Sequence, residues 1–272
     1  MDVFILKGKE IKMLRCVNEE DLHLEYYYFE YGSESQIYRV KSLCKCKEVY
    51  KKFLPSTSVK ILQNKEKKLQ LLNKRSSHLP AALLANRLVV KEDSLSGYIS
   101  DYINWGNLED EIVYSSIPLN KKIETLRKVQ NLLVEYLKEG IYYLDPSVAN
   151  ILCNLNKKKN IVILDMDNIA TEEYPADIYN LRMKRYLENG GKVNKQALIF
   201  AVNNLTRSCL RREFEDLKCS LSIKSISRLD YNSSIMGNFC FCLDSGENDC
   251  AMDHEFLLDY IENSNVYQRK KL

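Results

Sequence analysis

The chain has 272 residues, enough for one large domain or two small ones with a substantial hydrophobic core. Its 40 basic and 37 acidic residues leave a net charge of +3, which is too close to neutral to indicate a nucleic-acid partner. No apolar run approaches the ~20 residues of a membrane span, and the N-terminus lacks the pattern of a secretion signal. We therefore expect a cytoplasmic protein without a nucleic-acid or membrane partner.

The nine cysteines do not form a recognisable framework, because their number is odd and no C-x2-C pair occurs. No histidine lies close in sequence to the cysteine pairs at 44/46 and 240/242 to complete a zinc site. We expect reduced thiols, most of them packed as small apolar side chains, with a metal site as the less favoured alternative.

The first hundred residues predict a sheet of short strands. An aromatic segment at 23–31 predicts a strand that stops at Gly32, and a strand pattern resumes at 37–40. The pieces 81–90 and 97–103, separated by an acidic turn, predict a further hairpin. The polar loop that follows is the expected boundary between two lobes.

A third strand is predicted over 48–54, and its alternation places Lys51 on the same face as Val49 and Phe53. Lys51 therefore points in the direction of apolar neighbours. Either its ammonium is paired inside the protein, or only its aliphatic stem lies on that surface while the ammonium reaches water.

The next segment predicts a helix capped by residues 56–58, and Glu66 completes its apolar stripe of Val59, Leu62, Leu69 and Leu72. A buried carboxylate needs a partner, so we predict an ion pair between Glu66 and Lys51. The alternative is that Glu66 belongs to a solvated face together with its neighbours Lys65, Lys67 and Lys68.

A long helix is predicted from Pro118, with Gly140 as its left-handed stop. Asp145 follows this helix, Asn150 comes five residues later, and Asp165 ends the four-residue apolar strand 161–164. Two carboxylates and an amide are oxygen ligands suited to Mg²⁺. The alternative is that the two aspartates only stabilise turns.

The order of these features resembles the protein-kinase-like superfamily over roughly residues 24 to 210. The matching features are a glycine turn, a strand lysine, a helix glutamate, a hinge, a long helix, an Asp-x4-Asn motif and a strand-exit aspartate. The resemblance implies an α+β, two-lobed fold. Residues 1–103 would be an N-lobe with an antiparallel sheet plus one helix, and residues 104–272 a mainly helical C-lobe.

The resemblance also implies ATP and Mg²⁺ as cofactors and assigns a role to each matching residue. Asp145 would orient or deprotonate the attacking hydroxyl, Lys51 paired with Glu66 would neutralise phosphates, and Asn150 and Asp165 would hold Mg²⁺. The nucleotide would be contacted by Gly32, Ile37, Val49, Lys51, Ser100 as gatekeeper, and the backbone of Asp101 and Ile103.

The chain departs from the family pattern at several positions. The loop keeps one glycine, and Tyr143 and Leu144 replace the usual His and Arg, so we expect activity that does not depend on phosphorylation of the activation segment. Asp167 replaces the glycine of D-F-G and would be either a third carboxylate near the metal or a turn residue.

The function expected from the resemblance is phosphoryl transfer to a protein Ser or Thr, with a small hydroxylated molecule of the aminoglycoside or choline type as the second acceptor. One alternative is a pseudokinase that serves as a binding module. The other is a non-kinase α+β regulatory protein, in which Lys51 and Glu66 would lie apart.

Overall fold

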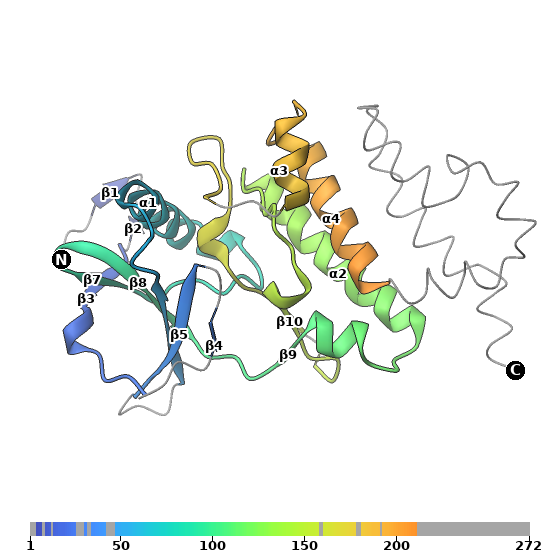
Figure 1. The fold of residues 1–272 in the computed structure, drawn as a ribbon, viewed down its shortest axis with the longest axis horizontal. Helices are drawn as coiled ribbons and strands as arrows, with labels where there is room; N and C mark the ends of the chain where they lie inside the picture. The colour runs from blue at the N-terminus through green and yellow to red at the C-terminus, as the bar shows by residue number, and fades with distance from the viewer. Residues whose placement is uncertain are drawn as a thin grey trace, which may run out of the picture. The chain divides into compact units, whose positions relative to one another are not determined.

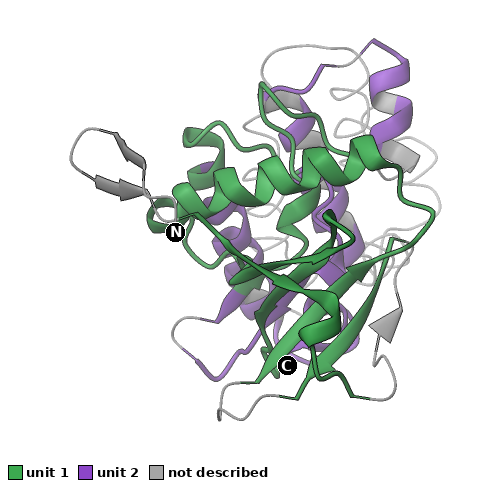
Figure 2. Ribbon diagram, turned by 90° about the vertical axis from the view of Figure 1, so that its left-hand side faces the viewer, with its two compact units in different colours: residues 1–105, 135–143, 162–178 green, residues 106–134, 144–161, 179–272 purple. Residues whose placement is uncertain are grey.

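The computed structural model describes residues 4–6, 9–11, 13–25, 30–31, 34–41, 47–157, 160–177, 181–190 and 192–210. The predicted turn at Gly32 and everything predicted after residue 210 lie outside these ranges. The chain divides into two compact units (Figure 2). Unit 1 contains Met1–Trp105, Glu135–Tyr143 and Val162–Ile178, and unit 2 contains Gly106–Val134, Leu144–Ile161 and Tyr179–Leu272.

Unit 1 is built on a six-stranded sheet with the strand order β3-β7-β8-β6-β5-β4 (Figure 1). Its strands are β3 (Arg15–Asn18), β4 (Glu30–Tyr31), β5 (Ser35–Val40), β6 (Glu48–Phe53), β7 (Arg87–Lys91) and β8 (Ser94–Asp101). A separate hairpin joins β1 (Phe4–Leu6) to β2 (Lys9–Ile11). The predicted antiparallel sheet needs one correction, because the edge strand β3 pairs with β7 in parallel.

The predicted hairpin forms as β7 and β8, but β7 begins at Arg87 and not at residue 81, and β8 runs from Ser94 to Asp101 and not over 97–103. Its turn residues Glu92 and Asp93 both have positive φ, at 50° and 61°, as the two-residue turns that match strand twist require. The alternation predicted for β6 is also confirmed. Tyr50 packs with Val89 and Ile99 in one buried cluster, whereas Phe53 belongs to a different cluster.

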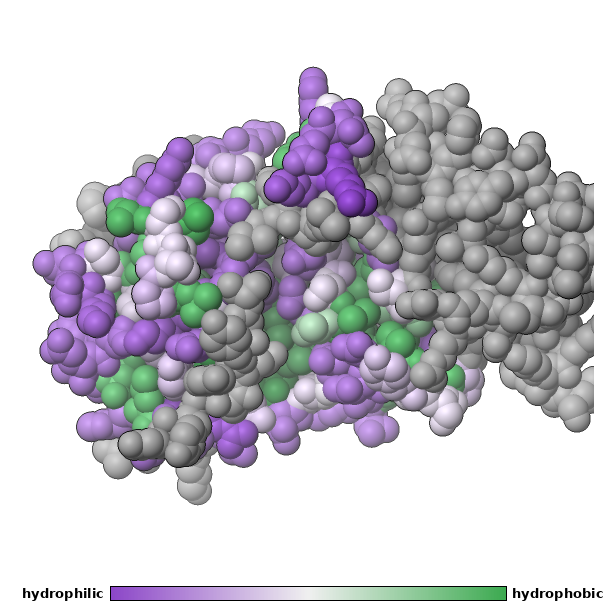
Figure 3. Space-filling view, in the orientation of Figure 1, coloured by the Kyte–Doolittle hydropathy of each residue, from purple (hydrophilic) through white to green (hydrophobic). Residues whose placement is uncertain are grey.

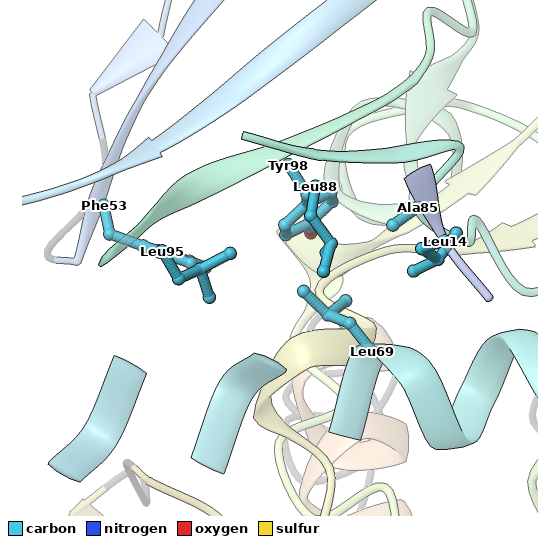
Figure 4. Packing of buried hydrophobic residues seen from close by; sticks show 7 residues of the cluster. All are labelled: Leu14, Phe53, Leu69, Ala85, Leu88, Leu95 and Tyr98. Atoms are coloured by element: carbon cyan, nitrogen blue, oxygen red, sulfur yellow. The ribbon is translucent and has the colours of Figure 1, made fainter. Parts of the chain in front are cut away.

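Helix α1 (Val59–Lys74) covers this second cluster. Ser58 caps the helix, its Oγ accepting a hydrogen bond from the Ile61 N–H at 3.4 Å. Leu69 of α1 points toward Leu88 and Tyr98 of the sheet (Figure 4). The cluster consists of Leu14, Phe53, Leu69, Ala85, Leu88, Leu95 and Tyr98.

The buried side of α1 differs from the predicted one. The residues it buries are Lys65, Lys68, Leu69 and Leu72, whereas Glu66 is exposed. Lys65 and Glu66 are turned by about 100° from one another around the helix axis, and it is Lys65 that faces inward. The prediction that Glu66 completes the core-facing stripe is therefore wrong.

Two later segments return to unit 1. The chain leaves helix α2 (Leu119–Lys138) through Gly140, whose φ of 68° confirms the predicted left-handed stop. Tyr142 then pairs with Ala170 through hydrogen bonds of 2.8 and 2.9 Å. Strand β11 (Ile161–Ile163) ends beside the segment 81–83, with which Ile163 exchanges two backbone hydrogen bonds of 2.8 Å.

The described part of unit 2 is mainly helical. It contains the first part of α2, which buries Ile123, Leu126, Val129 and Leu133. The remaining elements are β9 (Gly106–Asn107), the π-helix η3 (Glu109–Val113), the 3-10 helix η4 (Val148–Asn150), β10 (Ile151–Cys153), α3 (Leu181–Glu188) and α4 (Lys195–Cys209). Strands β9 and β10 pair antiparallel.

The described residues confirm a mixed α+β protein. None of the helices they form combines the length and the apolar character needed to cross a bilayer. On the face shown in Figure 3, the hydrophobic residues at the left, among the described part of unit 1, lie in small separate groups between hydrophilic ones.

Candidate functional site

The most unusual feature of unit 1 is a set of charged side chains buried between the sheet and α1. Lys51 of β6, which is 8 % exposed, forms ion pairs with Asp165 and with Asp167, the latter at 2.7 Å from Nζ to Oδ1. These aspartates lie 114 and 116 residues further along the chain. The structure thus brings the predicted strand lysine and the strand-exit carboxylate together.

Asp165 is held at its position by the hydrogen bonds of the two residues that precede it. The strand before it is fixed by the bonds of Ile163 to segment 81–83, and the Tyr143 hydroxyl donates a 2.9 Å hydrogen bond to the Leu164 carbonyl. Asp165 itself adopts a left-handed conformation with φ 56° and ψ 36°. Backbone strain of this kind in a residue other than glycine is concentrated at functional sites, and Asp tolerates it better than most residues.

Asp167, in the 3-10 helix η5 (Met166–Asn168), is completely buried. Its Oδ1 accepts hydrogen bonds from Lys51 and, at 2.9 Å, from the Tyr98 hydroxyl. Its Oδ2 accepts a hydrogen bond of 2.7 Å from Lys65. Because both oxygens are already bound by protein donors, Asp167 is an internal counterion that lies in a 3-10 turn.

Two lysines of α1 extend this arrangement. Lys65 also lies 3.1 Å from Glu34, and Lys68 pairs with Asp177 at 2.6 Å. Lys68 donates two further hydrogen bonds, to the carbonyls of Ile169 at 3.2 Å and Pro175 at 3.1 Å. We call these seven charged residues, namely Glu34, Lys51, Lys65, Lys68, Asp165, Asp167 and Asp177, the buried charge cluster.

Three members of the cluster, Lys51, Lys65 and Asp167, have pKa values shifted in the directions expected for ion pairs. Burial alone would lower the pKa of Lys51, but Asp165 and Asp167 outweigh it and hold that pKa well above its ordinary value. Burial would raise the pKa of Asp167, but Lys51 and Lys65 lower it far below its ordinary value. Lys68 behaves differently, since burial lowers its pKa and Asp177 compensates only in part.

Glu66 does not join the cluster, so the predicted ion pair between Glu66 and Lys51 is wrong. Glu66 instead lies near Cys16 of β3, where partial burial and this carboxylate together raise the pKa of the thiol. Sequence reasoning missed Lys65, Lys68 and Asp177. The spacing of Lys65 with Leu69 and Leu72 at i, i+4 and i+7 was the available signal for a buried lysine face.

The other residues assigned to the nucleotide lie on adjacent strands of unit 1. The register places Ile37 opposite Lys51, and Val49 opposite Ser100. Ser100 is buried, whereas Asp101 is exposed and accepts a 2.8 Å hydrogen bond from Asn86. Ile103 follows β8 and is half-buried, and Gly32 is outside the described residues.

Asp145 and Asn150 lie in one tight loop of unit 2. The Asp145 carbonyl accepts hydrogen bonds from the Ser147 N–H at 2.8 Å and from the Asn150 side chain at 3.5 Å. The Ser147 carbonyl accepts a further hydrogen bond from the Asn150 N–H at 3.1 Å. The loop therefore keeps the predicted base and the predicted metal ligand close to one another.

Within the described ranges, no three His, Cys, Asp or Glu side chains are grouped to hold a metal ion. Mg²⁺ usually binds through one or two carboxylates together with substrate phosphates, so it does not need such a group. In unit 1 the carboxylate that fits this role is Asp165, whose side chain is 26 % exposed, whereas Asp167 has no exposed surface.

Comparison with known proteins gives no family for this chain. No protein-family profile matches it, and no curated protein matches it significantly. Its function must therefore be inferred from the site.

The depressed pKa of Asp167 predicts a loss of stability in acid. The ionised carboxylate stabilises the fold above the unfolded-state pKa of about 4, and this contribution is lost as the pH falls below it toward the folded-state pKa. In urea unfolding between pH 4 and pH 2, we expect Asp167 to contribute up to about 1.4 kcal/mol per pH unit. The Asp167→Asn variant should show a correspondingly flatter dependence, and parallel curves for the two proteins would refute the assignment.

Proposed function

We propose that the protein is an ATP- and Mg²⁺-dependent phosphotransferase with a two-lobed, protein-kinase-like organisation, residues 1–103 and 104–272. The observation that supports it most strongly is the ion pair between the sheet lysine Lys51 and the strand-exit carboxylate Asp165. Phosphoryl transfer requires mainly positioning and charge compensation, which a fixed lysine and a metal-binding carboxylate supply.

Each functional residue has one role in this proposal. Lys51 binds the α- and β-phosphates, Asp165 and Asn150 provide oxygen ligands for Mg²⁺, and Asp145 orients the acceptor hydroxyl and takes its proton. Bound Mg²⁺ would neutralise charge on the transferring phosphoryl group. Glu66 has no role, because its side chain is exposed and Lys51 is paired with other carboxylates.

The remaining nucleotide contacts are proposed for Ile37 and Val49, for Ser100 as gatekeeper, for the backbone of Asp101 and Ile103, and for Gly32. This role is supported by the sheet register, in which Ile37 lies opposite Lys51, and Ser100 lies opposite Val49, two residues before Lys51 on the same strand. They would contact the base and sugar while Lys51 contacts the phosphates.

The segment that follows Asp165 supports activity without prior phosphorylation. Lys65 and Lys68 of α1 bind its residues Asp167, Ile169, Pro175 and Asp177. These contacts are buried ion pairs and hydrogen bonds, so no added phosphate is needed to order the segment.

The acceptor that we propose is a protein Ser or Thr hydroxyl, with a small hydroxylated molecule as the alternative. Labelled ATP separates the two, because a protein kinase should label itself or a general protein substrate. A small-molecule kinase should instead transfer the label to an aminoglycoside or choline-type compound and leave protein unlabelled.

A nucleotide-binding module without catalysis is the second candidate. It is favoured by the departures from the family pattern at Tyr143, Leu144 and Asp167, which replace residues that the family carries beside the catalytic aspartate and in the metal-binding turn. This candidate predicts Mg·ATP binding without transfer to any acceptor or to water.

Thermal unfolding with and without Mg·ATP tests the proposal. At ATP concentrations about 100-fold above Kd, the native chain should gain about 5 to 10 °C in Tm. The Asp165→Ala variant should lose most of the Mg²⁺-dependent part of this gain in Tm. The Glu66→Ala variant, which changes an exposed carboxylate, should keep it. An equal shift in the native chain and in Asp165→Ala would remove the metal role of Asp165, and no shift in the native chain would refute ATP binding.

A further inference from the structure

The two carboxylates that pair with Lys51 differ in what else they can do. Asp165 is partly exposed, and the proposed function assigns it to Mg²⁺. Asp167 is fully buried and bound by protein donors at both oxygens. When Asp165 is engaged by a cation, Asp167 is the carboxylate that remains to hold Lys51.

We propose that Asp167, fixed between Lys65 and Tyr98, is the positioning residue that holds Lys51 for the nucleotide phosphates. The proposal rests on the proposed function of this site and deepens it. It gives Asp167, two positions after Asp165, the role of pairing with Lys51 that the resemblance gave to Glu66.

Asp167 is held from both structural layers of unit 1. Tyr98 of β8 stands directly opposite Lys51 in the sheet register, so the two side chains point the same way and both reach Asp167 Oδ1. Lys65 approaches Oδ2 from α1. A carboxylate restrained by both the sheet and the helix has a fixed position, and it therefore fixes the position of the Lys51 ammonium that pairs with it.

The charge balance shows what the loss of Asp167 would change. Without its negative charge, Lys65 keeps Glu34 at 3.1 Å and Asp177 at 3.8 Å, whereas among the described residues Lys51 keeps Asp165 as its one carboxylate partner. Lys51 would then compete with Mg²⁺ for Asp165. Nucleotide binding should weaken, and the Mg²⁺ concentration needed for binding should rise.

The test uses the full chain with Asp167→Asn, which preserves the shape of the side chain, and Tyr98→Phe, which removes only the hydroxyl. Glu66→Gln is the matched control on the exposed side of α1. ATP affinity at saturating Mg²⁺ should fall on the order of tenfold in Asp167→Asn and less in Tyr98→Phe, and remain unchanged in the control. The Mg²⁺ concentration for half-maximal ATP binding should rise in Asp167→Asn.

A double-mutant cycle with Lys51→Met separates positioning from general stability. If Asp167 acts through Lys51, adding Asp167→Asn to Lys51→Met should cause no further loss of ATP affinity. Additive losses, or a Mg²⁺ requirement that is unchanged in Asp167→Asn, would overturn the positioning role. If Lys51→Met abolishes measurable ATP binding, the Mg²⁺ titration of Asp167→Asn is the measurement that decides the positioning role.

Urea unfolding of the native chain, Asp167→Asn, Lys51→Met and the double variant shows whether the ion pair between Lys51 and Asp167 forms. A coupling between Lys51 and Asp167 of at least about fivefold in the unfolding equilibrium constant is expected. If the native chain binds Mg·ATP and Asp167→Asn binds it with the same affinity, the positioning role is wrong and the proposed function is unaffected. If the native chain does not bind Mg·ATP, the proposed function and the positioning role both fall, and the unfolding cycle then reports only whether the ion pair forms.

Discussion

Replacing Asp145 with Asn is expected to reduce the rate of phosphoryl transfer by about 10²- to 10⁴-fold, the range typical for loss of a general base. The affinity for Mg·ATP should stay close to that of the native chain, because Asp145 is proposed to act on the acceptor hydroxyl. The measurement is transfer of labelled phosphate under single-turnover conditions, together with an ATP titration of both proteins.

A matched control for this experiment is Asp110→Asn, which changes an exposed carboxylate of the same unit. It should leave both transfer and binding unchanged. If Asp145→Asn retained full transfer activity, Asp145 would be only a loop residue whose carbonyl accepts the hydrogen bonds from Ser147 and Asn150.

The largest effect on stability is expected at Asp177. Its replacement by Ala leaves the ammonium of Lys68, which is completely buried, without its carboxylate partner. Removing one member of a buried ion pair typically costs about 3 to 5 kcal/mol, so the free energy of unfolding should fall by about this amount. Urea denaturation of the full chain measures it.

The control is Glu135→Ala, which breaks an exposed i,i+3 pair with Lys138 and should change the unfolding free energy little. A second comparison uses the double variant Lys68→Met/Asp177→Leu, in which neither charge remains buried. It should be more stable than Asp177→Ala, because two apolar side chains often replace a buried pair at small cost. A double variant as unstable as Asp177→Ala would show that the loss comes from packing and not from the unpaired charge.

Local patterns in the sequence predicted most of the described elements. The alternation in β6, the Ser58 cap of α1 and the left-handed Gly140 depend on neighbouring residues, and all three are confirmed. The helix α3 was not predicted, and the parallel pairing of β3 with β7 joins segments about 70 residues apart, for which neither strand carries a local signal.

The residues of the candidate site also fall into those predicted from local sequence and those identified only by the structure. Lys51 and Asp165 were singled out from the sequence, since a lysine on an apolar strand face and a carboxylate at the end of an apolar run are both local features. The choice of Asp167 over Glu66 as the partner of Lys51 was not available from the sequence. In the local pattern of α1, Glu66 fits the stripe of Val59, Leu62 and Leu69, whereas Lys65 fits Leu69 and Leu72, and the spacing alone does not choose between them.

The sequence by itself predicted most of the strands and helices, and it placed Lys51 on the apolar face of β6. Only the tertiary structure decided which side of α1 is buried. Two lysines can lie inside that interface because Asp167 and Asp177, more than 100 residues later in the chain, supply the negative charges that offset their loss of water. The side of a helix that faces the protein interior depends on all the groups packed against it. For α1 the deciding groups are carboxylates that are distant in the sequence.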